Sequence, residues 1–283
     1  MAAPKTILIT GATGRQGGAV AAELAGAGFS LRAMTRNPDS AAARALAARG
    51  VAVVRGDLDD EASIGSALAG VWGAFSVQNT WEAGVEKEEA QGKRFATLAR
   101  QAGVQHLVYT SVGSAHRQTG IPHFENKWRI EDTVRGLGFP SHVILRPVFF
   151  MENLMTPGFL NGDKLISALH PGTVLQMIAV RDIGQYGARA FTDAERLNRR
   201  EIDLAGDGLT LPEAAAQLGR ALGRPIEYQT IPMAEVRKHS EDVALMLEWF
   251  ERTGYDVDIP ALEREFGIPP TRFAAWAAGQ RAA

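Results

Sequence analysis

The chain has 283 residues, 46% of them hydrophobic, so it can bury a full core as one large domain or as one domain with a smaller lobe. Its formal net charge of −2 gives no electrostatic basis for binding nucleic acid or an anionic membrane surface. The absence of cysteine excludes disulfides, thiolate nucleophiles and cysteine-ligated metals. With no apolar run of the roughly 18 residues that span a bilayer, and a first strand too early for a signal peptide, we expect a cytoplasmic protein.

The first predicted element is an apolar strand, residues 5–10, which runs directly into a glycine-rich loop. Gly11, Gly14 and Gly17 follow as G-x-x-G-x-x-G, and a helix is expected over residues 19–27. Gly11 permits the tight turn, Gly14 lets the backbone approach phosphate oxygens, and Gly17 lets the helix pack closely on the strand. Free N–H groups at the start of the helix then face an anion. The segment predicts a dinucleotide pyrophosphate site; the alternative is an ordinary tight turn.

The second predicted strand, residues 30–35, indicates which dinucleotide binds. It ends at Arg36, where an NAD site usually carries Asp or Glu to bind the ribose hydroxyls. A second arginine, Arg15, lies inside the glycine loop. Two guanidinium groups can neutralise and hydrogen-bond a 2′-phosphate, so the predicted cofactor is NADP(H). The alternative is that both are solvated surface arginines.

Strands and helices keep alternating through the first half of the chain. Further strands are predicted at 51–55, 73–77, 106–111 and 142–145. Helices are predicted at 41–49, from a cap at Asp59 or Asp60 to residue 69, at 86–102 and at 124–135. Strands separated by helices pair in parallel and are covered on both faces, which predicts an α/β, Rossmann-type doubly wound sheet. The charged cluster at 86–89 is interpreted as a solvated helix start.

The regular alternation stops after residue 147. Residues 149–172 are predicted as loops and short helices, 173–178 as a strand that returns to the sheet, 180–193 as a helix and 201–204 as a strand. A helix at 212–222 begins with a capping box of Thr210 and Glu213, and is followed by a strand at 226–230 and helices within 234–253 and 261–278. We expect an NAD(P)-binding domain at 1–150 and a smaller mixed lobe for substrate or partner at 151–283. Segments 173–183 and 201–206 would return to the Rossmann unit.

The candidate catalytic residues follow the fifth predicted strand. His123 and Lys127 are four residues apart and share one helix face. Lys127 can hold the nicotinamide ribose hydroxyls, and His123 can supply a proton near neutral pH. Ser111 or Ser114 can orient a substrate carbonyl. The alternative for the His/Lys pair is a solvated helix face.

Several large side chains have two possible roles. They either shape an apolar pocket over the nicotinamide or pack between the two lobes, and they are Trp81, Phe149, Phe150, Met151 and Met155. The other histidines show no metal-ligand spacing, so no metal site is predicted.

Six stretches of this sequence resemble the NmrA-like branch of the atypical short-chain dehydrogenase/reductase superfamily: 11–17, 35–36, 56–57, 78–82, 123–127 and 145–154. The resemblance implies a cofactor site with the pyrophosphate, the 2′-phosphate, the adenine, the ribose and the nicotinamide in turn along it. The residues implied are Gly11, Thr13, Gly14, Arg15, Gln16 and Gly17 for the pyrophosphate; Arg36 for the 2′-phosphate; Asp57 and Leu58 for the adenine; Asn79 and Thr80 for the ribose side; Lys127 for the nicotinamide ribose; and Pro147, Val148 and Phe149 for the carboxamide end.

The sequence departs from this superfamily at the proton donor. Standard members use Tyr-x-x-x-Lys, and here His123 stands in place of the tyrosine. Relatives with this replacement include redox-sensing regulators, and others resemble quinone reductases. We therefore predict an NADPH-dependent oxidoreductase that reduces a small apolar carbonyl, enone or quinone; the alternative is a non-catalytic NADP(H) sensor that regulates a protein partner. Neither nucleic acid nor membrane is an expected partner, and the protein would be a monomer or homodimer.

Overall fold

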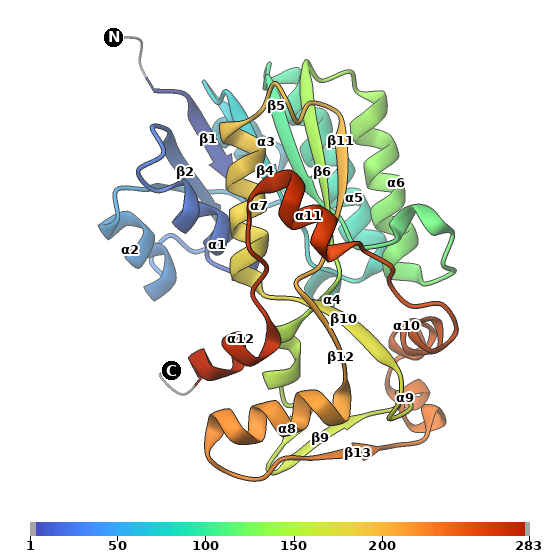
Figure 1. The fold of residues 1–283 in the computed structure, drawn as a ribbon. Helices are drawn as coiled ribbons and strands as arrows, with labels where there is room; N and C mark the ends of the chain where they lie inside the picture. Colours follow the sequence, from blue (N-terminus) through green and yellow to red (C-terminus); the bar gives the residue numbers. More distant parts are fainter. Residues whose placement is uncertain (1–3, 281–283) are drawn as a thin grey trace.

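A seven-stranded sheet with all neighbouring strands parallel forms the larger part of the computed structural model, which describes residues 4–280 (Figure 1). Its strand order contains the 3-2-1-4-5-6 order of a Rossmann fold, and the predicted fold class is confirmed. In their order across the sheet the strands are β11 (Arg200–Leu204), β6 (Ser141–Pro147), β5 (His106–Thr110), β4 (Gly73–Ser76), β1 (Thr6–Ile9), β2 (Ser30–Thr35) and β3 (Ala52–Arg55).

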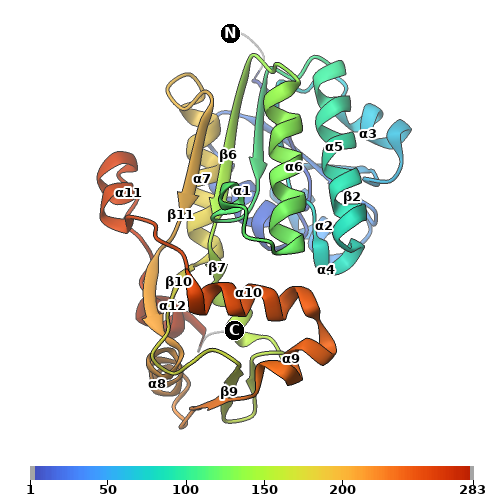
Figure 2. The same cartoon turned by 90° about the vertical axis from the view of Figure 1, so that its right-hand side faces the viewer.

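Helices cover both faces of this sheet, which explains why its central strands are largely apolar (Figures 1 and 2). Ile7 and Ile9 of β1 pack into the core on one face, and Leu8 between them packs into the core on the other. The first face is covered by α1 (Arg15–Leu24), α2 (Ala41–Ala48) and α7 (Val180–Thr192). The second is covered by α3 (Glu61–Leu68), α5 (Val85–Gln101) and α6 (Pro122–Gly136).

Helix α7 returns to the larger unit because two glycines let it approach α1 closely. A Cβ on Gly184 would lie 2.8 Å from the backbone carbonyl of Ala19, and one on Gly187 would lie 2.5 Å from a methyl of Val20. Both separations are shorter than real Cβ contacts, so a side chain at either position would push the helices apart. Helix α7 and strand β11 thus join a sheet whose other strands all precede residue 148.

A smaller lobe lies beside the carboxyl ends of the strands and contains two three-stranded sheets (Figure 2). The first consists of β12 (Asp207–Thr210), β10 (Val174–Ile178) and β7 (Phe149–Phe150), and the second of β13 (Glu227–Thr230), β9 (Lys164–Ser167) and β8 (Leu160–Asn161). The lobe also contains η2 (Met151–Met155), α8 (Leu211–Leu222), α9 (Met233–His239), α10 (Glu241–Arg252) and α12 (Phe273–Gly279). Helix α11 (Ile259–Phe266) packs on the core of the larger unit.

The structure differs from the sequence prediction at several elements of this lobe. Strand β10 pairs with β7 and β12, so segment 173–178 does not return to the large sheet. Strands β7, β8 and β9 lie where loops and short helices were predicted, and β12 was not predicted. The capping box of Thr210 and Glu213 at the start of α8 is confirmed. Helix α1 begins at Arg15, four residues earlier than predicted, because glycines 17 and 18 lie inside its first turn.

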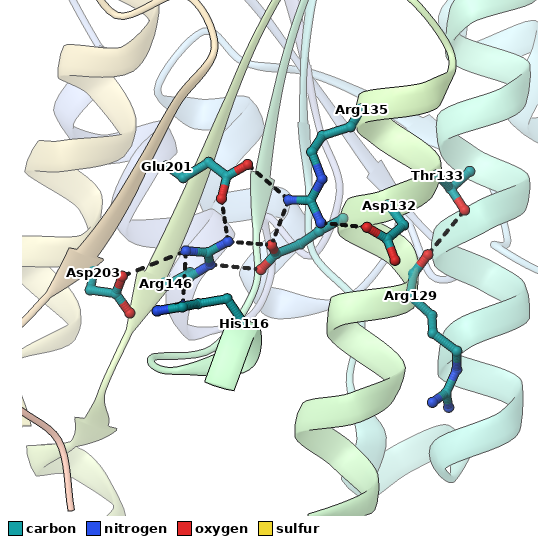
Figure 3. Close-up of polar contacts among 9 residues, drawn as sticks. His116, Arg129, Asp132, Thr133, Arg135, Arg146, Glu201 and Asp203 are labelled. Atoms are coloured by element: carbon teal, nitrogen blue, oxygen red, sulfur yellow. Dashed lines mark hydrogen bonds and ion pairs between the residues drawn. The ribbon is translucent and has the colours of Figure 1, made fainter. Parts of the chain in front are cut away.

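A buried network of charges fixes α6 to the edge of the large sheet (Figure 3). Arg146 of β6 donates to the fully buried Glu131 of α6 through Nε at 2.9 Å and Nη2 at 2.6 Å. It also contacts Glu201 and Asp203 of β11. Burial opposes the charge of Arg146, but these carboxylates outweigh it and raise the pKa of Arg146 above its ordinary value. The network therefore fixes α6, which carries His123 and Lys127, relative to two strands.

Candidate dinucleotide and substrate site

One cavity of about 880 Å³ lies at the carboxyl ends of β1 and β4, between the two lobes. The strand order reverses direction between β1 and β4, which is where ligands bind in sheets of this kind. Of the residues that the sequence predicted for the site, these line the cavity: Gly11, Thr13, Gly14, Arg15, Gln16, Gly17, Arg36, Asp57, Leu58, Asn79, Thr80, Ser111, His123, Lys127, Pro147, Val148 and Phe149. Their individual roles remain predictions.

The glycine loop has the geometry that a pyrophosphate site requires. Gly11 has a φ of +59°, which a side chain would strain. A Cβ on Gly17 would lie 2.5 Å from the carbonyl of Gly11, so only glycine lets α1 come this close to the loop. Within the described residues α1 has no side-chain cap and no acidic residue in its first turn, whereas α2 and α3 are capped by Ser40 and Asp60. Its first N–H groups are thus free to bind an anion.

The two arginines that predicted NADP(H) have different partners. Arg36 forms an ion pair with Glu82 of α4 (Thr80–Ala83), and the hydrogen bond to Glu82 raises the pKa of Arg36 above its ordinary value. The pair is largely exposed, so an incoming phosphate can compete for the guanidinium. Arg15 instead donates from Nη1 to Oδ1 of Asn153 in η2, at 3.0 Å. Arg36 therefore contacts α4, which follows β4 in the chain, whereas Arg15 contacts η2.

Lys127 is held by a buried carboxylate that the sequence interpretation missed. Its ammonium group pairs with Glu88 of α5, which is fully buried and also accepts hydrogen bonds from Thr80 and Asn126. Burial raises the pKa of Glu88, but the charge of Lys127 and these hydrogen bonds outweigh it and hold the pKa below its ordinary value.

The interpretation of residues 86–89 as a solvated helix start is wrong for Glu88. This residue shares the buried face of α5 with Gln91, Gly92 and Phe95, at helical spacings of three, four and seven. The helical periodicity of this segment could have shown that Glu88 points inward.

His123 and Ser111 both line the cavity. The His123 ring packs against Trp81 and Phe124, with ring centroids 5.2 Å and 4.8 Å apart, and its Nδ1 lies 2.6 Å from Oδ2 of Asp242 in α10. The buried Ser111 hydroxyl has no hydrogen-bond partner among residues 4–280, which makes it a candidate for a hydrogen bond to a ligand. Ser114 does not line the cavity; its backbone N–H donates to Asp203.

The large apolar residues divide between the cavity and the core of the smaller lobe. Trp81, Phe149 and Phe150 line the cavity, whereas Met151 is fully buried in the core and Met155 packs against it. The sequence analysis did not single out the other large residues that line the apolar end of the cavity, which are Phe124, Phe159, Val243, Met246 and Tyr255.

Two absences hold for the part of the chain that the structure describes. It contains no helix that is both long enough and apolar enough to cross a membrane. It also contains no group of three or more His, Asp or Glu residues that could hold a metal ion.

Comparison with known proteins matches residues 3–274 to the NmrA-like family. A (4-alkanoyl-5-oxo-2,5-dihydrofuran-3-yl)methyl phosphate reductase from Streptomyces griseus is 31% identical, over 96% of each chain. The structure of the NADPH-dependent quinone oxidoreductase QOR2 from Escherichia coli in complex with NADPH is 27% identical, covers 97% of this chain and 99% of that one, and superposes with a TM-score of 0.81. NmrA, a negative transcriptional regulator, in complex with NAD is 23% identical over 99% of this chain and 91% of that one, with a TM-score of 0.74, a likeness of fold.

Proposed function

The chain belongs to the NmrA-like family, and on this premise we propose that it is an NADPH-dependent oxidoreductase of a small apolar carbonyl, enone or quinone. One observation carries the proposal. A single cavity joins an uncapped helix N-terminus and Arg36 to an apolar compartment that contains His123, Lys127 and the free hydroxyl of Ser111. An anionic dinucleotide fits the first part, and a small substrate with one polar atom fits the second.

Each polar residue of the cavity has a separate role in the proposed reaction. Bound reduced nicotinamide supplies a hydride to the substrate. Lys127, held by Glu88, orients the ribose beside it. Ser111 donates a hydrogen bond to the substrate oxygen, and His123 supplies the proton that this oxygen gains. The aromatic lining keeps water away from the reacting atoms.

The relatives support an enzyme that acts on a small molecule. The Streptomyces griseus protein, aligned over nearly the full length of both chains, is a reductase, and QOR2 is an NADPH-dependent quinone oxidoreductase. NmrA is a regulator, but its similarity to this chain is a similarity of fold and does not favour the regulatory alternative. The apolar compartment with a free serine hydroxyl favours a substrate over a sensor that binds only the dinucleotide.

Turnover is tested by mixing the purified protein with NADPH and a panel of quinones, enones and carbonyls, and following the absorbance of reduced nicotinamide. We expect substrate-dependent oxidation of NADPH, strongly reduced in Lys127→Met. Binding is measured separately by tryptophan fluorescence. If NADPH binds and no compound is reduced, the oxidoreductase proposal fails, and a comparison of protein partners captured with NADP⁺ and with NADPH tests the sensor.

The cofactor preference has its own test in Arg36→Ala. Losing a charge-assisted pair to the 2′-phosphate should weaken NADPH binding by about 10-fold or more while changing NADH binding by less than about 2-fold. Arg44→Ala is the control, because Arg44 is an exposed arginine that does not line the cavity. Equal weakening of both cofactors would mean that Arg36 does not contact the phosphate.

A further inference from the structure

Asp242, at the start of α10, reaches from the smaller lobe to the start of α6 in the larger one. Figure 2 shows α10 lying across the end of α6 that faces the smaller lobe. Helix α6 has no cap from its own N-cap residue, Ile121. Instead, the backbone N–H of His123 donates to Oδ1 of Asp242 at 3.2 Å. One oxygen of Asp242, a residue of the smaller lobe, therefore caps α6.

The other oxygen of Asp242 lies beside the imidazole of His123. Oδ2 lies 2.6 Å from Nδ1 of His123, in a contact that does not have the geometry of a hydrogen bond. Phe124 meets the ring edge-on at an interplanar angle of 89°, and Trp81 lies against it at 55°. Only 8% of the His123 side chain is exposed, so these neighbours leave the ring little freedom to turn. Asp242 lies on the Nδ1 side of the ring, and the ring lines the cavity.

From this geometry we propose that Asp242 is a positioning residue that turns Nε2 of His123 toward the substrate for proton transfer. The chemistry rests on the proposed function. As hydride reaches the carbonyl carbon, or the far carbon of a conjugated enone or quinone, negative charge develops on the substrate oxygen. The Nε2–H bond breaks, an O–H bond forms, and the neutral ring regains a proton from water. The carboxylate beside Nδ1 balances the positive charge of the ring before transfer.

Asp242→Asn tests this role while preserving the cap. Asparagine accepts from a helix N–H as well as aspartate does, so the substitution removes the charge beside the ring and keeps the backbone contact. The matched control is Glu241→Gln, because Glu241 is the adjacent acid of the same helix turn and pairs with Arg237 on the surface. Both variants lose one negative charge near the start of α10, so its dipole contributes equally.

The kinetic readout separates positioning from binding. We expect D242N to lower kcat by about 10-fold or more, because general acid catalysis contributes 10²–10⁴-fold and depends on ring orientation. KM and NADPH affinity should stay within about 2-fold of wild type, and E241Q should match wild type throughout. The double variant of D242N with His123→Gln should be no slower than His123→Gln alone. Losses that multiply in the double variant would overturn the proposal.

A spectroscopic readout does not depend on turnover. The ¹⁵N resonances of the His123 ring, assigned with His123→Gln, should change in D242N and stay unchanged in E241Q. Unchanged ring resonances in D242N would overturn the positioning role, whatever the kinetics. If wild type reduces no substrate, the proposed function fails, and the ring resonances still decide the role of Asp242. Should D242N not fold, Asp242→Glu moves the charge by one methylene, and a wild-type kcat together with wild-type ring resonances in that variant would overturn the proposal.

Discussion

The buried pair of Glu88 and Lys127 gives a sharp test of the site's architecture through Glu88→Gln. Glutamine has almost the same shape as glutamate, so the substitution creates no cavity and removes the charge alone. In wild type the Glu88 side chain is fully buried and that of Lys127 is 12% exposed. After the substitution the ammonium group of Lys127 stays largely out of water without a counter-charge.

The structure allows the size of this effect to be worked out. Removing one partner of a buried ion pair costs about 3–5 kcal/mol. Because the glutamine oxygen still accepts from Asn126, we expect the lower end, a loss of about 3 kcal/mol in the free energy of unfolding. Glu89→Gln is the matched control: Glu89 pairs with Lys93 and Arg129 near the surface, where such pairs contribute about 0–1 kcal/mol.

Urea unfolding followed by fluorescence gives the free energy of unfolding of both variants. The double variant Glu88→Gln/Lys127→Met removes both charges and should recover most of the stability lost in Glu88→Gln. The folded-state pKa of Glu88 lies below 4.5, so its contribution is complete above pH 4.5 and is lost as pH falls through the folded-state value. The gap between wild type and E88Q should therefore shrink in acid. A loss in E88Q no larger than that in E89Q, or a gap that grows in acid, would refute the reasoning.

Three further predictions concern the glycine loop, a buried histidine and the charge network. Gly17→Ala should weaken NADPH binding, measured by fluorescence titration, by about 10-fold or more, because the new methyl would clash with the Gly11 carbonyl. The control Gly65→Ala, whose methyl would meet no neighbouring atom within 4 Å, should leave binding unchanged. Burial lowers the pKa of His106 to about 4, so wild type should lose up to about 3 kcal/mol of stability as pH falls from 6.5 to 4, and urea unfolding of His106→Asn should show a flatter pH dependence. Arg146→Met should lower the free energy of unfolding by about 3–5 kcal/mol, because it leaves the buried Glu131 with Arg135 as its remaining ion-pair partner. Arg196→Met, at an exposed ion pair, should lower it by less than about 1 kcal/mol. Similar losses in the two variants would contradict the buried network.

Local pattern was sufficient to predict the large sheet. Most of its strands are short, largely apolar runs, and six of the seven begin and end within one residue of the predicted positions; β6 starts one residue earlier and ends two residues later than predicted. Pairing between distant segments was not predictable from such runs. Strand β12 contains Asp207 and Gly208, which read locally as a turn, and it is a strand because β10 lies beside it.

In the cavity, too, local motifs were predictable from the sequence and contacts between distant segments were not. Residues in local motifs, such as Gly11, Arg36 and Lys127, were singled out from the sequence and line it. The side chains that hold them come from elsewhere: Glu88 lies 39 positions before Lys127, and Asp242 lies 119 positions after His123. Helical periodicity marks Glu88, whereas nothing in the sequence around Asp242 distinguishes it from Glu241. Such partners follow from the tertiary fold, which is why the predicted site lacked its supporting carboxylates.

Strand β11 has a consequence for how this protein can be divided. It joins β6 from more than fifty residues further along the chain, after β7, β8, β9 and β10 of the smaller lobe. A fragment that stops near residue 150 would expose the free backbone edge of β6, where other strands can add. It would also keep Arg146 and Glu131 without Glu201 and Asp203. We therefore expect such a fragment to aggregate on expression. A stable nucleotide-binding unit would have to include β11.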